Sequence, residues 1–199
     1  METKEKTQFL DKVVQSLRKA AVEVEEFQVQ ATLGRAEAQD KYEEVKKNFN
    51  AFIHESKAKI HTGKEKIDDI NVKLDEIRVQ LALGKAETID AFKKQKKDLL
   101  LKLHELEVKI KTNERVSRMY ALVLIEIEKF KVQLEVLEQK LDEGKVEAKA
   151  SFEKRKLEFN KFIDDIKAKY AKKEETKWEH FQDEVSQAFS HLKMAFKTS

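Results

Sequence analysis

The sequence of 199 residues contains no cysteine, no proline and only four glycines. Without cysteine the chain has no disulfide, no thiolate metal ligand and no thiol nucleophile. Average usage would give about ten prolines in a chain of this length, and their absence leaves nothing that obliges a helix to end. Folds rich in β-strands depend on frequent glycine and proline turns, so the composition predicts an all-α protein.

Charge of one sign and long apolar runs are also scarce. The chain has 41 Lys and Arg residues against 38 Asp and Glu, a net charge of +3 although 40% of its residues are charged. This balance is typical of a solvated helical surface and argues against nucleic acid as a partner. The longest apolar run, Met119–Ile125, is far shorter than the ~18 residues that span a bilayer. Because residues 1–6 are charged where a secretory signal would be apolar, we expect a soluble, cytoplasmic protein.

Three segments of the chain resemble one another, at residues 29–42, 79–92 and 139–152. Each contains a glycine, then a basic residue, a glutamate three residues on and an aromatic residue eight residues on. The glycines are Gly34, Gly84 and Gly144. Apolar or small residues recur at spacings of three and four on both sides of each glycine, with one extra residue after it. This spacing predicts one long packed helix per repeat, with the glycine near the middle of its buried line.

The intervals between the glycines predict how these helices connect. If neighbouring helices fold back with their glycines level, the turns fall halfway between, near residues 59 and 114. Both midpoints lie beside break signals, Gly63 and the polar segment 112–115. We therefore predict an elongated antiparallel coiled-coil bundle, with rods about 70–85 Å long. Its three long helices would span about residues 5–60, 65–111 and 114–170, forming one domain over residues 1–170.

The three glycines of the repeat need a common cause, because a glycine inside a helix costs about 1 kcal/mol relative to alanine. Two interpretations stay open. Gly34, Gly84 and Gly144 could form a narrow waist that permits close helix packing or bending. Alternatively, they reflect plain packing, or descent from one duplicated helix.

Residues 171–199 form a separate amphipathic segment, with apolar side chains at spacings of three and four and the single tryptophan of the chain. The stripe consists of Trp178, Phe181, Val185, Phe189, Leu192 and Phe196. It can fold back on the bundle as a short fourth helix, extend the third helix and pair with another subunit, or lie on a membrane. The mixed charge of its polar face makes the membrane the least favoured of the three.

The sequence holds no pattern that indicates catalysis. The five histidines have no glutamate three residues before them and no histidine one turn away, which excludes the usual helical di-iron and zinc patterns. The densest basic cluster, residues 93–97, is interpreted as a solvated helix face, because the equivalent residues 43–47 include two glutamates. We expect no enzymatic activity, no cofactor, no metal and no small-molecule substrate.

Two features carry a resemblance to a known group of proteins. One is the repeat, which reads Leu83-Gly84-Lys85-Ala86-Glu87 in its second copy, and the other is the tail from Lys177 to Phe196. Together they resemble small bacterial coiled-coil proteins that are rich in Ala, Glu and Lys, lack cysteine and are linked to stress response. The resemblance implies a bacterial cytosolic protein and assigns no functional residues.

These observations predict a non-enzymatic structural protein that acts through helix-mediated association. Its partner would be itself, as a homo-oligomer, or another helical protein, with the stripe from Trp178 to Phe196 buried between subunits. The alternative is a peripheral membrane or lipid-binding protein that opens as an amphipathic bundle. The lack of proline counts against this alternative, because lipid-exchange helices are usually punctuated.

Overall fold

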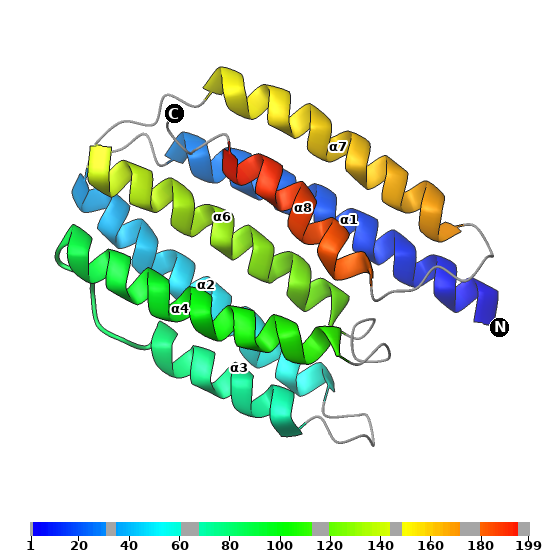
Figure 1. Cartoon of the computed structure of the whole chain (residues 1–199), viewed down its shortest axis with the longest axis horizontal. Coiled ribbons are helices and arrows are strands. Elements are labelled where there is room, and N and C mark those ends of the chain that lie inside the picture. The colour runs from blue at the N-terminus through cyan, green and yellow to red at the C-terminus, as the bar shows by residue number, and fades with distance from the viewer. Residues whose placement is uncertain are drawn as a thin grey trace.

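The computed structural model describes residues 2–30, 35–60, 68–112, 120–143, 149–171 and 180–194. The regular structure in these residues is helical, as the composition predicts (Figure 1). The helices are α1 (Glu2–Gln30), α2 (Arg35–Ile60), α3 (Asp68–Leu81), α4 (Ile89–Lys111), α6 (Ala121–Glu143), α7 (Lys149–Ala171) and α8 (Phe181–Met194). The all-α class is therefore confirmed.

The prediction of three long helices is wrong. Each predicted helix is a pair of shorter antiparallel helices, α1 with α2, α3 with α4 and α6 with α7 (Figure 1). The chain therefore has opposite directions before and after the glycine of each repeat, where the sequence inserts its one extra residue. The longest described helix, α1, has 29 residues and is about 44 Å long. The predicted rods of 70–85 Å do not form.

The turn between α3 and α4 shows why the helices end at the repeat. The last turn of α3 tightens, because the Ala82 N–H donates to both Arg78 O at 3.0 Å and Val79 O at 3.2 Å. Thr88 then caps α4, its hydroxyl accepting a hydrogen bond from the Ala91 N–H at 3.1 Å. These local stop and start signals outweigh the apolar spacing, which continues through the turn.

The two predicted turns also coincide with helix ends. α2 ends at Ile60 and α4 ends at Lys111, with Thr112 as its C-cap. Gly63 and residues 113–115 of the polar segment predicted to make these turns lie outside the described residues. Each copy of the repeat is thus a pair of antiparallel helices, a hairpin, bounded by the breaks that the midpoints predict. The two arms pack on each other in the α3–α4 hairpin, whereas α1 and α2 meet through α6, and α6 and α7 meet through α1 and α8.

The apolar stripe of the repeat is buried on both arms of each hairpin. The residues ten before and fifteen after each glycine are buried in all three copies: Val24, Leu74, Leu134, Phe49, Leu99 and Phe159. The stripe continues across the turn because both arms face the same core, not because they form one helix. An exception is Thr88, which is exposed because it caps α4.

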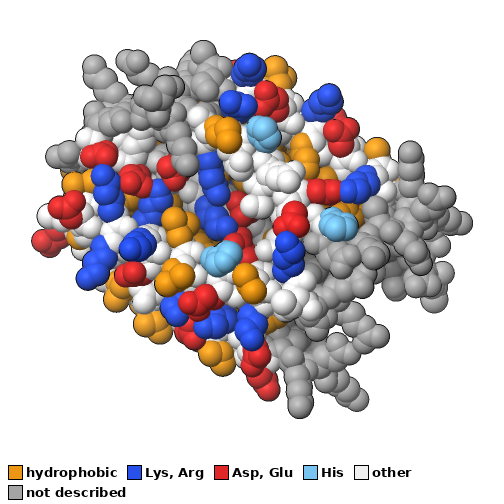
Figure 2. All heavy atoms as spheres, in the orientation of Figure 1, with side chains coloured by type: hydrophobic (Ala, Val, Ile, Leu, Met, Phe, Trp, Pro, Cys, Tyr) orange, Lys and Arg blue, Asp and Glu red, His pale blue; other side chains and the backbone are white. Residues whose placement is uncertain are grey.

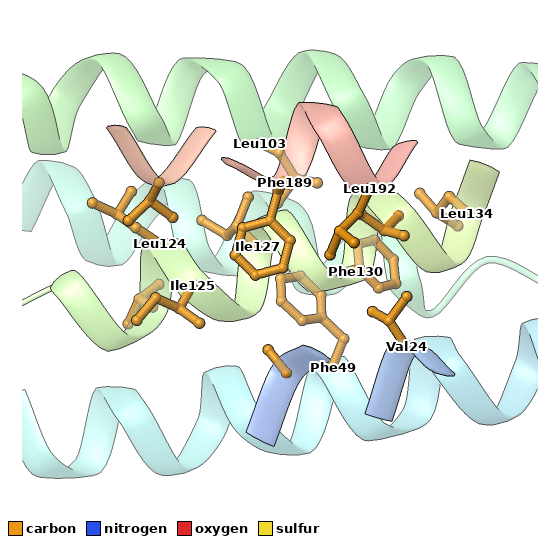
Figure 3. Packing of buried hydrophobic residues seen from close by; sticks show 14 of the residues in the cluster. Val24, Phe49, Leu103, Leu124, Ile125, Ile127, Phe130, Leu134, Phe189 and Leu192 are labelled. Carbon is orange, nitrogen blue, oxygen red and sulfur yellow. The ribbon is translucent and has the colours of Figure 1, made fainter. Parts of the chain in front are cut away.

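Helix α6 lies at the centre of the fold and is shared by two groups of four helices. It packs directly against α2 and α4 on one side, and against α1 and α8 on the other. Helix α3 completes the first group by packing on α2 and α4, and α7 completes the second by packing on α1 and α8. Its sequence explains this place, because it is apolar around most of its circumference, including the consecutive buried residues Val123, Leu124 and Ile125. Figure 3 shows the core where α1, α2, α4, α6 and α8 meet, with Phe49 and Phe130 stacked at 4.2 Å between ring centroids.

Candidate interaction surfaces

The predicted C-terminal stripe is buried within its own chain. Helix α8 packs against α6 and α7, and Phe181, Val185, Phe189 and Leu192 are at most 1% exposed. The Phe189 ring meets the edge of Phe159 with 4.8 Å between centroids. Of the three alternatives, the structure thus has the segment folded back as a short helix. Trp178 and Phe196, the two ends of the stripe, lie outside the described residues.

Polar contacts fix the orientation of α8 on the bundle. Lys111 Nζ of α4 lies 2.8 Å from Asp183 Oδ1, and Lys169 of α7 pairs with Glu184. The Gln182 side-chain amide donates to the Glu107 carbonyl oxygen at 3.2 Å. The first two pairs are largely solvent-exposed, so each contributes on the order of 0.2–1 kcal/mol. These ion pairs therefore specify the register of α8 on the bundle more than they strengthen its binding.

A cluster of four charged side chains lies where α4, α6 and α8 meet. Lys131 Nζ is 2.6 Å from Glu107 Oε1 and 2.9 Å from Glu128 Oε1, and Lys193 Nζ is 3.2 Å from Glu128 Oε2. Burial raises the pKa of Glu107, and Lys131 offsets only part of that effect. Burial also acts on Glu128, but Lys131 and Lys193 together outweigh it and hold its pKa below the usual value. The two carboxyls therefore respond oppositely to acidification.

A lysine twelve residues after each glycine, buried in the first two copies and half-buried in the third, is a feature that the sequence interpretation missed. In the first copy, Lys46 is 2% exposed, and its ammonium donates to Leu83 O at 2.8 Å and pairs with Glu43 at 2.8 Å. The ammonium also lies 4.7 Å from the centroid of the Tyr42 ring. Lys46 of α2 thereby holds the α3–α4 turn.

The equivalent lysines of the other two copies join hairpins in the same way. Lys96 is 8% exposed and pairs with Glu138 and, at 2.7 Å, with Glu135 of α6. Lys156 of α7 pairs with Glu25 of α1 at 2.5 Å. The basic cluster 93–97 is therefore not a uniformly solvated face, because its fourth residue lies in the helix interface. The missed signal is the constant four-residue step from the aromatic residue of the repeat to this lysine, which puts both on one helix face.

The predicted glycine waist is wrong at Gly84, which lies exposed in the α3–α4 turn rather than on the buried line of a helix. No atom comes within 4 Å of a Cβ built there. The carbonyl oxygen of Gly84 accepts a hydrogen bond from Gln95 Nε2 at 2.9 Å, and Gln95 Oε1 accepts one from the Tyr42 hydroxyl at 3.0 Å. Gly34 and Gly144 lie outside the described residues.

A groove of about 310 Å³ lies over α6 between α1 and α2. Its charged lining consists of Glu23, Glu26, Glu44, Glu126 and Lys129. Lys129 Nζ lies 2.5 Å from Glu23 and 2.6 Å from Glu126, so one ammonium faces two carboxylates. The groove is acidic overall, but an acidic lining on a helix bundle does not specify a ligand.

Within the described residues, no three His, Asp or Glu side chains gather as metal ligands would. His54, His104, His180 and His191 are exposed there, and His61 lies outside these residues. A search of the described helices likewise finds no helix long and apolar enough to cross a membrane.

Comparisons with known proteins find no counterpart. No family model matches the chain, and neither a curated protein nor a solved structure matches it significantly.

Proposed function

We propose that the protein is a non-enzymatic structural protein that works through association of its helices, with a second copy of itself or with another helical protein. The observation that carries the proposal is the way α8 is bound. Its apolar stripe is buried against α6 and α7, and ion pairs with α4 and α7 fix its register. A second copy offers the identical surface, so α8 can be exchanged between two chains with every contact preserved. A cytoplasmic, stress-related role belongs to the same proposal.

Reciprocal exchange of α8 reconciles its burial with an interaction role. In a single chain the stripe of α8 is hidden, whereas in an exchanged dimer the same stripe forms the interface. The bundle itself then remains unchanged, because each chain receives the helix that it donates. Association of this kind needs no additional apolar surface, so it leaves the monomer soluble.

Complementary charge variants test the exchange. One chain carries Lys111→Glu and Lys169→Glu, and the other carries Asp183→Lys and Glu184→Lys. In each variant alone, α8 meets charges of its own sign on α4 and α7, both within a single chain and within an exchanged homodimer. Only an exchanged heterodimer restores opposite charges at all four pairs. At about 0.2–1 kcal/mol per pair, this favours the heterodimer by about fourfold to several hundredfold.

The measurement is native mass spectrometry of the two variants, separately and mixed, with the wild type as reference. We expect a heterodimer in the mixture that exceeds either homodimer. A matched control is the same mixing experiment with Lys12→Glu and Asp11→Lys, two exposed residues of α1 remote in sequence from these pairs. If the mixture holds no heterodimer at concentrations where the wild type dimerises, exchange of α8 is excluded.

A peripheral membrane function is the second candidate, favoured by the fully apolar buried face of α8. If α8 detached and lay on lipid, its mixed polar face would bind neutral and anionic surfaces with little difference. Vesicle flotation with neutral and anionic lipid tests this candidate. Binding of the full chain that is lost in Phe189→Asp would support it, and the absence of binding to either vesicle would reject it.

A further inference from the structure

The outer face of the α3–α4 hairpin carries apolar side chains that are largely exposed among the described residues. Val72 and Val79 of α3 are 55% and 64% exposed, and Leu101 and Val108 of α4 are 56% and 46% exposed. In each helix the two residues are seven apart, so they lie two turns apart on one side. Figure 2 shows apolar side chains interspersed with charged ones over the lower part of the molecule, where α3 and α4 lie.

Four charged residues at the α3–α4 interhelical boundary accompany these apolar side chains. Lys73 Nζ of α3 lies 2.7 Å from Glu105 Oε2 of α4, and Lys102 Nζ of α4 lies 2.9 Å from Glu76 Oε2 of α3. Along each helix the lysine also pairs with the glutamate three residues on, at 3.0 Å in α3 and 3.3 Å in α4. Their side chains are 22–34% exposed. These four residues, which we call the charge quartet, therefore alternate in sign both along and across the hairpin.

The face has a local two-fold pattern. Adding 29 to the residue numbers on α3 gives the same kind of residue on α4: valine or leucine, lysine, glutamate and valine. The equivalent pairs are Val72 with Leu101, Lys73 with Lys102, Glu76 with Glu105 and Val79 with Val108. Because the two helices are antiparallel, this relation is a rotation of 180° about the direction that points out of the face. Two independent stretches of sequence thus present the same pattern to the same solvent.

We infer that this face binds the same face of a second copy of the chain. When two alternating quartets are laid face to face by a two-fold axis in the plane of the face, every lysine meets a glutamate. This holds whether the axis runs along the helices or across them. Either arrangement also brings the valine and leucine side chains of one copy near those of the other. The face is therefore complementary in charge and apolar pattern to itself, as an isologous interface requires.

Charge also distinguishes a second copy from other occupants. The quartet is neutral, so it offers no field that would attract an anionic membrane or nucleic acid. A partner of one charge sign would be repelled by two of the four side chains. A partner that matches all four must carry the same alternating pattern at the same spacing. The inference rests on the proposed self-association but uses a surface distinct from α8.

An inverted quartet provides the decisive variant. It combines Lys73→Glu, Glu76→Lys, Lys102→Glu and Glu105→Lys, so every pair within the hairpin keeps opposite charges. The variant should fold and dimerise as the wild type does, because the inverted pattern is also self-complementary. Mixed with the wild type, however, it sets lysine over lysine and glutamate over glutamate. Mixed dimers should then fall below about one in ten where this face alone pairs the chains, and between that fraction and the one in two of random pairing where α8 is exchanged as well.

The readout is native mass spectrometry after mixing and full exchange of two mass-labelled chains. If the inverted variant forms dimers but pairs with the wild type at random, the inference about this face is wrong. The proposed self-association through α8 would still stand. A wild type that stays monomeric at every concentration would overturn both.

An apolar variant gives a second, independent measurement. Val79→Glu with Leu101→Glu should weaken self-association at this face at least tenfold without changing the helical circular dichroism. Val22→Glu with Val29→Glu is its control, because these two valines are exposed on α1 in the same seven-residue spacing. Equal effects of the two double variants would also reject the α3–α4 face.

Discussion

Replacing Phe189 by alanine tests how firmly α8 is held. The side chain is 0% exposed and lies among the core residues of α6 and α8 that Figure 3 shows. A buried Phe→Ala substitution costs about 3–5 kcal/mol through lost burial and the cavity that remains. The edge-on contact with Phe159, at 4.8 Å between centroids, accounts for about 0.5–1.5 kcal/mol of such a loss.

This loss should fall on the docking of α8 before it affects the rest of the fold. α8 is the last described helix, and its neighbours α6 and α7 are also held by α1. Since 1.4 kcal/mol is a factor of ten, the population with α8 detached should rise by roughly a hundredfold to several thousandfold. Hydrogen exchange measured by mass spectrometry should show faster exchange in α8 and little change in α3 and α4.

Met194→Ala is the matched control, because Met194 belongs to the same helix and is 52% exposed. Its effect on stability should stay within about 0.5 kcal/mol. A cost below about 1 kcal/mol for Phe189→Ala, with unchanged exchange in α8, would refute the reasoning that this stripe anchors the helix.

Four further substitutions have contrasting expected effects on stability. Glu107→Gln should leave stability at pH 7 unchanged or higher, because burial raises the pKa of Glu107, and should remove the gain that the wild type shows as pH falls through that raised pKa. Glu128→Gln should cost about 1.5–3 kcal/mol at pH 7, a contribution that the wild type loses as pH falls below the ordinary glutamate range through the lowered pKa of Glu128. Urea unfolding from about pH 3 to pH 7 measures both effects. Lys46→Met should cost about 1–3 kcal/mol in urea, and the neighbouring, exposed Lys47→Met almost nothing. Gly84→Ala should be neutral or stabilise by up to about 1 kcal/mol in thermal unfolding, whereas a glycine needed for close helix packing would make it destabilising.

Spacing predicted which residues are buried better than it predicted where helices end. The positions of Val24, Phe49 and Phe92 in the core follow from steps of three and four residues. The same steps continue across the α3–α4 turn, because both arms of the hairpin pack on one core. Only the single extra residue after the glycine and the capping residue Thr88 indicated the reversal. Apolar periodicity indicates which side of a helix is buried. It hardly reveals a turn when the helices before and after that turn face the same core.

The interaction surfaces were harder to predict, because they depend on contacts between distant residues. Lys96 is one of four lysines in a short stretch, and its burial depends on Glu135 and Glu138 of another hairpin. The self-complementary face depends on the register of α3 against α4, which places Lys73 opposite Glu105. A sequence pattern contains the charges but not that register, so a hairpin folded differently would scatter them.

Two self-complementary surfaces on one chain have a joint consequence. Exchange of α8 and pairing of the α3–α4 faces are both isologous contacts, each of which alone closes into a dimer. A chain that uses both must alternate them, so its assemblies grow in one dimension with concentration and do not stop at two. Sedimentation velocity should then show a distribution that broadens with loading. Val79→Glu with Leu101→Glu should collapse this distribution to a dimer. A wild type that stops at a dimer, whatever the loading, would mean that at most one of the two surfaces operates.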